Sequence, residues 1–364
     1  MVTYPDDFSV QEGKGLVASL GNLNIVKCFT QKNLQHPRYG LGSGKVDEIK
    51  EFLKQTKYEQ IIVDEHMTAK QIYNLEKATG VKVVDRERLI LDLFYSRSTT
   101  SEAKLQIQLA EIKYELPRIR ENAKLLIGNE RPGKGGSGEY IVDVKFRDLK
   151  RRMTFISKKL AESKRKRDLY HNQRIEDRMP IVSLVGYTSS GKTTLFNSLT
   201  LESNETSENL FTTLSTTTRS LIIGGRKLLL IDTVGFIRRL PTYMIEAFKS
   251  TLEESLQADI IILLIDSSES IDEIKIKYYS CMNVLEELKV DKEKIVIVFS
   301  KIDKADFENA KRAITELQIV DPVLVSPKSG YGINKLRKSI SRRIHPLLKD
   351  MGSSIIPEIS NKVL

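Results

Sequence analysis

Apolar positions in the first hundred residues alternate between short continuous runs and helical spacings. Continuous runs predict strands at Leu16–Leu20, Ile25–Phe29, Gln60–Asp64 and Val81–Asp85. Helical spacings predict helices at Val46–Gln55, Thr68–Ala78 and Arg86–Tyr95. This alternation is typical of a parallel sheet covered by helices. We therefore expect residues 1–100 to form a small α/β domain.

Two long apolar stripes follow, each with steps of three and four residues. The first consists of Leu105, Leu109, Ile112, Leu116 and Ile119, and the second of Phe146, Leu149, Met153, Ile156 and Leu160. Such spacing places each set on one face of a helix, so residues 101–178 are expected to form an antiparallel helical pair. The stretch Gly128–Gly138 is rich in glycine and predicts a flexible connection. Pro117 is expected to kink or split the first helix.

The region 179–348 contains nearly continuous apolar runs, which indicate a mostly parallel sheet covered on both faces. Six strands are predicted, at Ile181–Val185, Ser220–Ile223, Lys227–Ile231, Ile260–Ile265, Ile295–Phe299 and Val323–Ser326. A last helix is predicted at Ile333–Ile344, and residues 349–364 form a short tail. The fold class predicted for the whole chain is therefore α/β, with the helical pair between two α/β domains.

Composition changes this picture little. The chain of 364 residues is 40% hydrophobic and 29% charged, and it lacks an apolar run of membrane-spanning length. Residues 1–7 have neither a basic start nor an apolar stretch, so we expect no signal peptide. Cys28 and Cys281 are far apart, which favours two reduced thiols. We expect a cytoplasmic monomer without a membrane span.

The formal net charge of +10 is concentrated in one segment. Residues 145–178 contain thirteen Lys/Arg and five Asp/Glu, so this segment alone carries 13 − 5 = +8. A clustered basic patch is typical of a surface that binds a phosphate backbone. The alternative is a solvated helix face whose lysines have no partner.

The clearest chemical motif follows the strand Ile181–Val185 directly. Its residues are Gly186, Tyr187, Thr188, Ser189, Ser190, Gly191, Lys192, Thr193 and Thr194. This is a G-x-x-x-x-G-K-[ST] phosphate loop between a buried strand and a helix. Main-chain amides of such a loop bind phosphate, Lys192 supplies a charge for the β- and γ-phosphates, and Thr193 is expected to bind Mg²⁺. The alternative is a strand–helix turn without a ligand.

Two further segments are expected to complete the phosphate and metal site. Asp232 ends an apolar strand and is expected to hold Mg²⁺, while Gly235 leaves its amide free for the γ-phosphate. The Thr-rich stretch 211–219 resembles a switch loop, in which one threonine closes over Mg²⁺ and the γ-phosphate. Composition alone leaves open which threonine does so.

Two segments near the C-terminus indicate that the base is guanine. Ser300, Lys301 and Asp303 follow the strand Ile295–Phe299, and Asp303 can accept hydrogen bonds that guanine offers and adenine does not. Ser326, Pro327 and Lys328 stand where a main-chain N–H usually reaches guanine O6. Pro327 has no N–H, so guanine selectivity is expected to depend on Asp303.

The expected reaction is hydrolysis of GTP to GDP and phosphate. Lys192, Gly235 and the switch threonine are the candidate catalytic residues. Phe236 stands where many GTPases have the glutamine that orients the attacking water, so slow turnover is expected. A different class of function is the alternative: an RNA-binding module in which the nucleotide is mainly structural.

With these residues in view, the chain resembles the HflX family of translation-associated GTPases. The resemblance spans roughly residues 10–345. The segments that match the family's motifs are Gly42–Ile49, Asp85–Phe94, Leu105–Ala110, Tyr114–Arg118, Gly186–Thr188, Asp232–Arg238 and Leu240–Pro241.

The resemblance implies a family-specific N-terminal domain, a helical pair and a Ras-like GTPase domain. It also implies binding to the large ribosomal subunit, with the basic segment 145–178 as a surface for ribosomal RNA, and a role in splitting or rescuing ribosomes under stress. The family pattern around Phe211 makes Thr213 the switch threonine and third Mg²⁺ ligand, ahead of Thr212. Ser189 stands where the family has Asn.

Overall fold

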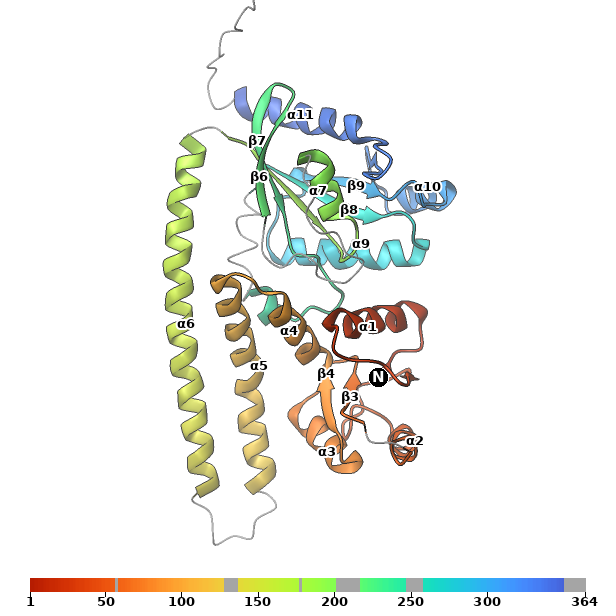
Figure 1. Ribbon diagram of the computed structural model, residues 1–364, viewed down its shortest axis with the longest axis vertical. Helices are drawn as coiled ribbons and strands as arrows, with labels where there is room; N and C mark the ends of the chain where they lie inside the picture. Colours follow the sequence, from red (N-terminus) through yellow and green to blue (C-terminus); the bar gives the residue numbers. More distant parts are fainter. Residues whose placement is uncertain (56–57, 128–136, 177–178, 201–216, 247–257, 350–364) are drawn as a thin grey trace, which may run out of the picture.

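Figure 1 shows the computed structural model of the protein, which describes residues 1–55, 58–127, 137–176, 179–200, 217–246 and 258–349. An N-terminal α/β region, two long helices and a second α/β region follow one another along the chain. The two α/β regions lie one above the other, and the long helices stand beside them. The α/β fold class is confirmed, while the domain boundaries near residues 100, 178 and 348 stay predictions.

The N-terminal region is built on a four-stranded sheet with the order β2-β1-β3-β4. All three strand pairings are parallel. The strands are β1 (Val2–Thr3), β2 (Phe29–Thr30), β3 (Gln60–Val63) and β4 (Lys82–Asp85). The third and fourth strands agree with the prediction, β2 begins only at the last residue of the run Ile25–Phe29, and β1 was not predicted.

The predicted strand Leu16–Leu20 is wrong, because these residues end helix α1 (Asp7–Leu20). The Asp6 carboxylate caps the start of α1 by accepting a hydrogen bond from the Ser9 N–H, and Gly21 ends it with φ 77°. Phe8 and Leu16 are buried on one helical face, and neighbouring Val17 widens that face. A short apolar run at the end of a helix is easily mistaken for a strand when the helix begins in polar residues.

The other predicted helices of this region are present. They are α2 (Ser43–Leu53), α3 (Ala69–Thr79) and α4 (Arg86–Arg97). Helix α3 has a reciprocal capping box between Thr68 and Gln71, and Gly80 ends it in a left-handed conformation.

The two apolar stripes do form a helical pair, α5 (Ser101–Ile127) and α6 (Ser137–Glu176), which lie side by side and antiparallel in Figure 1. Nine of the ten predicted stripe residues form one apolar cluster between the helices, and only Phe146 is not among them. Helix α5 is not split at Pro117. The ring of Pro117 is exposed, while its neighbours Leu116 and Ile119 pack toward α6. The predicted glycine-rich connection lies mostly outside the described residues.

The second α/β region contains the predicted six-stranded sheet, in the order β10-β9-β8-β5-β7-β6. Only β6 and β7 pair antiparallel, joined by a turn at Gly224 and Gly225 with φ 59° and 74°. The strands are β5 (Ile181–Gly186), β6 (Thr217–Ile223), β7 (Arg226–Asp232), β8 (Ile260–Asp266), β9 (Ile295–Ser300) and β10 (Val323–Leu324). The helical elements are α7 (Lys192–Thr200), α9 (Ile271–Glu287), η1 (Lys292–Lys294), α10 (Phe307–Glu316) and α11 (Ile333–Lys349).

Successive residues of the central strands point to opposite faces of this sheet. Val182 and Leu184 pack with α7 and α11 in one core. Ile181 and Val185 pack in another core with α9, and this core continues into α1 and α4 of the N-terminal region. One face of the second sheet is therefore covered partly by the N-terminal region. Among the described residues, no helix combines the length and apolar character needed to cross a bilayer.

Candidate functional site

The phosphate loop leaves β5 at Gly186, whose φ of 153° favours glycine. A Cβ at this position would come within 2.5 Å of the Leu264 carbonyl oxygen, so no side chain fits there. Ser189 and Gly191 also have positive φ values, 61° and 93°. Helix α7 then begins at Lys192. The backbone thus turns sharply from a buried strand into a helix N-terminus, a geometry that binds anions.

Lys192 lies folded over this loop. Its Nζ donates hydrogen bonds to the carbonyl oxygens of Gly186 (3.2 Å) and Tyr187 (2.9 Å). The side chain is buried, and the loss of water lowers the pKa of Lys192 to about 8, although nearby Asp232 opposes the shift. An anion held by the loop would favour the charged form of this lysine.

Thr193 and Asp232 are brought together at the same edge of the sheet. The Thr193 hydroxyl donates a hydrogen bond of 2.8 Å to Asp232 Oδ2, and Asp232 is only 1% exposed. A hydroxyl and a carboxylate side by side are the oxygen ligands that Mg²⁺ prefers. Both residues therefore fit a magnesium site. Thr213, the third predicted ligand, and its neighbour Thr212 lie outside the described residues.

The segment after β7 pairs directly with the phosphate loop. The N–H of Phe236 donates to the Gly186 carbonyl (2.9 Å), and the N–H of Thr188 donates to the Phe236 carbonyl (2.8 Å). Gly235 lies so close that a Cβ on it would come within 3.0 Å of Lys192 Nζ. The Phe236 side chain is 2% exposed and packs in the core shared with the N-terminal region. Gly235 thus lies against the phosphate loop, while Phe236 has a packing role.

The two predicted base-recognition segments meet at the ends of β9 and β10, which pair in parallel. A hydrogen bond with Ser326 lowers the pKa of Asp303, which keeps this exposed carboxylate ionised. Lys301 Nζ forms an ion pair of 2.5 Å with Asp266 at the end of β8. Pro327 is half-buried and Lys328 exposed beside them.

The side chain of Ser300 contacts the main chain of the phosphate loop. Its hydroxyl lies 2.6 Å from the carbonyl oxygen of Ser190 in the phosphate loop and 3.1 Å from that of Ile265. Ser300 therefore connects the base-recognition segment to the phosphate loop. The buried hydroxyl takes its partners from the main chain.

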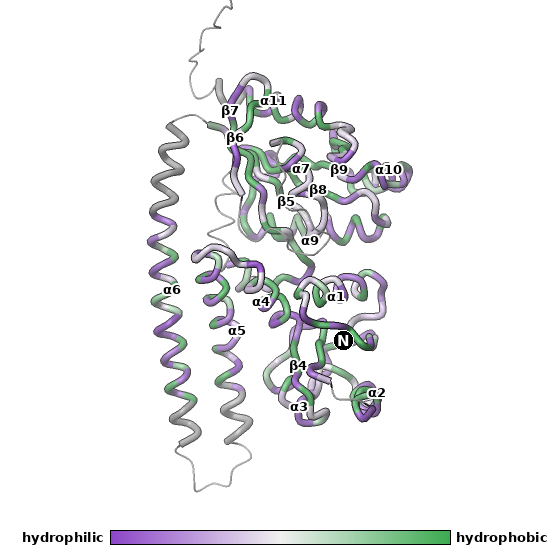
Figure 2. The backbone as a smooth tube through the Cα atoms, viewed as in Figure 1, coloured by the Kyte–Doolittle hydropathy of each residue, from purple (hydrophilic) through white to green (hydrophobic). Residues whose placement is uncertain are grey.

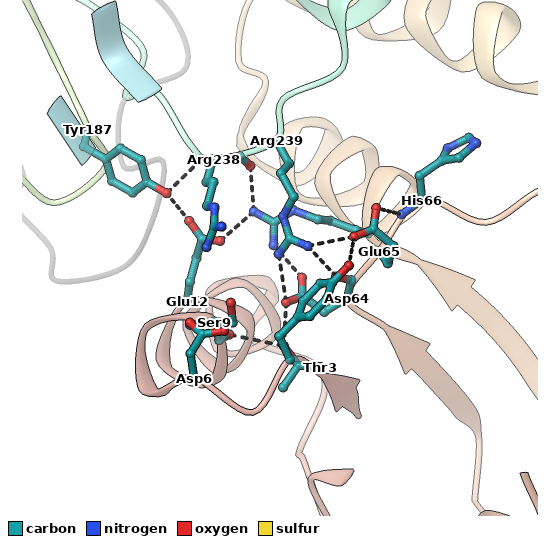
Figure 3. A network of polar contacts seen from close by, with 12 residues as sticks. Thr3, Asp6, Ser9, Glu12, Asp64, Glu65, His66, Tyr187, Arg238 and Arg239 are labelled. Atoms are coloured by element: carbon teal, nitrogen blue, oxygen red, sulfur yellow. Dashed lines mark hydrogen bonds and ion pairs between the residues drawn. The ribbon is translucent and has the colours of Figure 1, made fainter. Parts of the chain in front are cut away.

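Sequence reasoning missed a buried polar network between the N-terminal region and the segment after β7 (Figure 3). At its centre is Arg86, which is 2% exposed and pairs with both Glu12 (2.7 Å) and Asp64. The same guanidinium donates 2.8 Å to the carbonyl oxygen of Arg238. Arg86 thus joins two N-terminal carboxylates to the main chain of the second region.

Tyr187 joins the phosphate loop to this network. Its hydroxyl donates a hydrogen bond to Glu12 and accepts one of 2.7 Å from the Arg238 N–H. Burial, reinforced by the negative charge of Glu12, raises the pKa of Tyr187, so the hydroxyl keeps its proton. Nothing in the sequence indicates that Tyr187 contacts the N-terminal region in addition to its place in the phosphate loop.

Arg239 makes the second half of the network. It adopts a φ of 55°, unusual for a residue with a side chain, and pairs with Glu65 (2.9 Å) and Asp64 (3.4 Å). Its guanidinium lies over the ring of Tyr4, whose hydroxyl donates 2.5 Å to Glu65. These contacts hold the strained backbone of Arg239 against the N-terminal sheet.

Comparisons with known proteins agree with this geometry. A family model described as GTP-binding GTPase N-terminal matches residues 7–95, and one described as GTP-binding GTPase Middle Region matches residues 97–174. A third, described as 50S ribosome-binding GTPase, matches residues 181–301. The phosphate loop and the elements around it, carried on a mostly parallel sheet, define a P-loop GTPase.

Relatives match along almost the whole chain. GTPase HflX of Methanocaldococcus jannaschii is 40% identical over 342 residues, which cover 93% of this chain and 84% of the relative. GTPase HflX of Thermococcus kodakarensis is 37% identical, with 97% and 81% covered. A crystal structure of SsGBP in complex with GDP is 27% identical, with a TM-score of 0.53 and 95% and 97% covered. The chain belongs to the HflX family of GTPases, and it binds and hydrolyses GTP.

Proposed function

We propose that this GTPase is a Mg²⁺-dependent switch that binds the large ribosomal subunit and uses residues of the phosphate loop for catalysis. Lys192 holds the β- and γ-phosphates, Thr193 and Asp232 hold the metal, and Gly235 donates its amide to the γ-phosphate. When bound, Mg²⁺ supplies positive charge to the phosphate oxygens during transfer. The contact of Thr193 with Asp232, next to buried Lys192, is the single observation that carries the assignment.

Base recognition in this proposal rests on Asp303. Its lowered pKa keeps a carboxylate available for the N1 and 2-amino groups of guanine. Thr213 closes over the metal in the triphosphate state. Because Phe236 is buried in a core, its side chain does not orient water, so turnover by the free protein is slow.

The basic helix α6 supports the ribosomal partner. Leu149, Ile156 and Leu160 face α5, while Arg151 and Lys158 are exposed on other faces of the helix. Exposed cations on a long helix suit the phosphate backbone of ribosomal RNA. The family description that names 50S ribosome binding supports the same partner. Ribosome splitting or rescue is the process in which such a switch would act.

The experiment measures co-sedimentation with large ribosomal subunits and GTP hydrolysis in the same samples. We expect binding with a non-hydrolysable GTP analogue to exceed binding with GDP, and subunits to accelerate hydrolysis. Lys192→Ala should lower single-turnover hydrolysis by about 100-fold or more, because the phosphate charge loses its partner. Lys311→Ala, at an exposed position of α10, is the matched control.

A second pair of variants tests the role of α6. Replacing Arg151, Arg152 and Lys158 by Gln should weaken subunit binding, whereas replacing Lys54, Lys70 and Lys82 of the N-terminal region should not. Equal binding with the analogue and with GDP would contradict the switch. Hydrolysis that neither subunits nor Lys192→Ala changes would favour an RNA-binding module with a structural nucleotide.

A further inference from the structure

Helix α11 carries a basic face that the proposed site does not use. Lys335, Lys338, Arg342 and His345 are spaced by three, four and three residues and are all exposed. At about 3.6 residues per turn, this spacing puts them in one row, which extends over about 15 Å of helix. The row is called the α11 basic face below.

The opposite side of α11 packs in the core. Leu336, Ile340 and Ile344 are at most 2% exposed and pack in the core on one face of the second sheet. On the flanks of the helix, Arg343 donates 2.9 Å to the carbonyl oxygen of Glu293, and Arg337 donates to that of Ile222. The helix is therefore held in place by its apolar side and flanks, and the α11 basic face is left to solvent.

The charge on this face is not balanced locally. Within α11 there is no Asp or Glu, and in the part of the chain that the structure describes no ion pair involves Lys335, Lys338 or Arg342. Like charges three and four residues apart repel each other and destabilise a helix. Among the described residues, no ion pair of these three side chains offsets that repulsion.

The neighbouring helices of the same region show the usual pattern. Lys275 of α9 pairs with Glu316 of α10, and Lys311 of α10 lies beside Glu308. Among α9, α10 and α11, only α11 contains no Asp or Glu. Two further exposed cations, Arg226 and Lys227, follow the Gly224–Gly225 turn, which packs against Ser341 of α11.

We propose that the α11 basic face is a second RNA-binding surface of this protein, which contacts the phosphate backbone of ribosomal RNA independently of α6. The proposal rests on the ribosomal partner proposed above. An anionic membrane is the less suitable polyanion, because a helix that binds lipid inserts apolar side chains, and Leu336, Ile340 and Ile344 are buried in the core. Figure 1 shows α11 at the end of the molecule opposite the N-terminal sheet, the same end at which α6 finishes. In Figure 2, hydrophilic positions recur along α11.

The experiment uses the full chain with Lys335, Lys338 and Arg342 all changed to Gln. Its control changes Lys292, Lys311 and Arg312 to Gln, which removes the same charge from exposed positions of η1 and α10. We expect the α11 variant to bind large ribosomal subunits about tenfold more weakly or worse, with a salt dependence reduced by about two to three phosphate contacts. The control should bind as the wild type does. GTP hydrolysis by the free protein should be unchanged in both variants, because α11 lies outside the nucleotide site.

Each outcome decides the proposal. Equal subunit binding by the α11 variant and the control overturns it. If the wild-type protein does not bind large subunits at all, the proposed function fails, and the same comparison on a short RNA duplex decides this inference separately. In the RNA-duplex experiment, weaker binding by the α11 variant than by the control supports the proposal, and equal binding overturns it. Wild-type binding to phosphatidylserine vesicles that needs these three residues, without any effect on RNA binding, also overturns it.

Discussion

Lys192 illustrates how one side chain is tuned by its surroundings. Two main-chain carbonyls accept its hydrogen bonds, and burial brings its pKa to about 8. The motif places this lysine in the phosphate loop, and its role toward the phosphates stays a prediction. The lowered pKa could not be predicted, because it depends on burial by Gly235 and other residues that pack from distant parts of the chain.

This lowered pKa predicts proton uptake when nucleotide binds. Because burial lowers the pKa of Lys192 to about 8, we expect part of this lysine to be neutral at pH 8 in the free protein, and bound phosphates to raise its pKa by favouring the charged form. We expect calorimetric binding enthalpies of a GTP analogue at pH 8 to differ between buffers of unequal ionisation enthalpy. The difference should shrink toward pH 6.5, where Lys192 is already charged. Lys192→Arg keeps the charge at all these pH values and should abolish the effect. Identical enthalpies in all buffers at pH 8 would refute the explanation.

Tyr187 and Arg239 make contacts that sequence motifs do not predict. Tyr187 was assigned to the phosphate loop by position, and the loop is where it lies. Its hydroxyl nevertheless contacts Glu12, 175 residues earlier in the chain. Arg239 takes a positive φ because its side chain pairs with Glu65 and Asp64. Contacts between residues so far apart depend on how the regions pack, which local patterns do not encode.

At the scale of elements, apolar spacing predicted best where a helix buries one narrow stripe. In the α5–α6 pair, the stripe residues Leu109 and Ile156 face the other helix. Helix α5 also buries Ile107 and Ala110 on another side, in the core shared with the N-terminal region. The strands β5 and β8 were equally predictable, since they are buried on both faces. Helix α1 was misread because its core face includes Glu12, a charged residue buried through its partners Arg86 and Tyr187.

The helical pair offers a direct test of this packing. Ile156 is 3% exposed between the helices, whereas its neighbour Phe155 is 59% exposed. Ile156→Ala should destabilise the pair by about 2–4 kcal/mol, through lost burial and a cavity. Hydrogen exchange measured along α5 and α6 should therefore become faster in this variant. Phe155→Ala should leave exchange within the pair nearly unchanged. Similar acceleration in both variants would mean that the stripe does not hold the helices together.

At the scale of the whole molecule, the N-terminal region and the GTPase region are joined by buried charge as well as by apolar contacts. Arg86 pairs with both Glu12 and Asp64, and all three side chains are buried. Removing one partner of a buried ion pair leaves the other charge uncompensated, which is far more costly than losing an exposed pair.

This contrast predicts different costs for two neighbouring arginines. Arg86→Met should lower the free energy of unfolding by about 3–5 kcal/mol, because Glu12 loses its ion-pair partner and Asp64 keeps only the longer contact with Arg239. Arg88→Met is the matched control, since Arg88 is partly exposed and pairs with Asp92 and Glu111, and it should cost about 1 kcal/mol or less. Urea unfolding followed by circular dichroism measures both. Equal costs would show that the buried cluster does not stabilise the joined regions.

The core that continues from α1 and α4 to α9 also constrains how this chain can change over time. Phe8 and Leu89 of the N-terminal region share one apolar cluster with Val185 and Ile237 of the GTPase region. A substitution on either side must suit partners in both regions. An N-terminal region taken from another family member would therefore bring half of a core shaped for different neighbours. Exchange of the N-terminal region between relatives should therefore succeed only where both halves of that core are exchanged together.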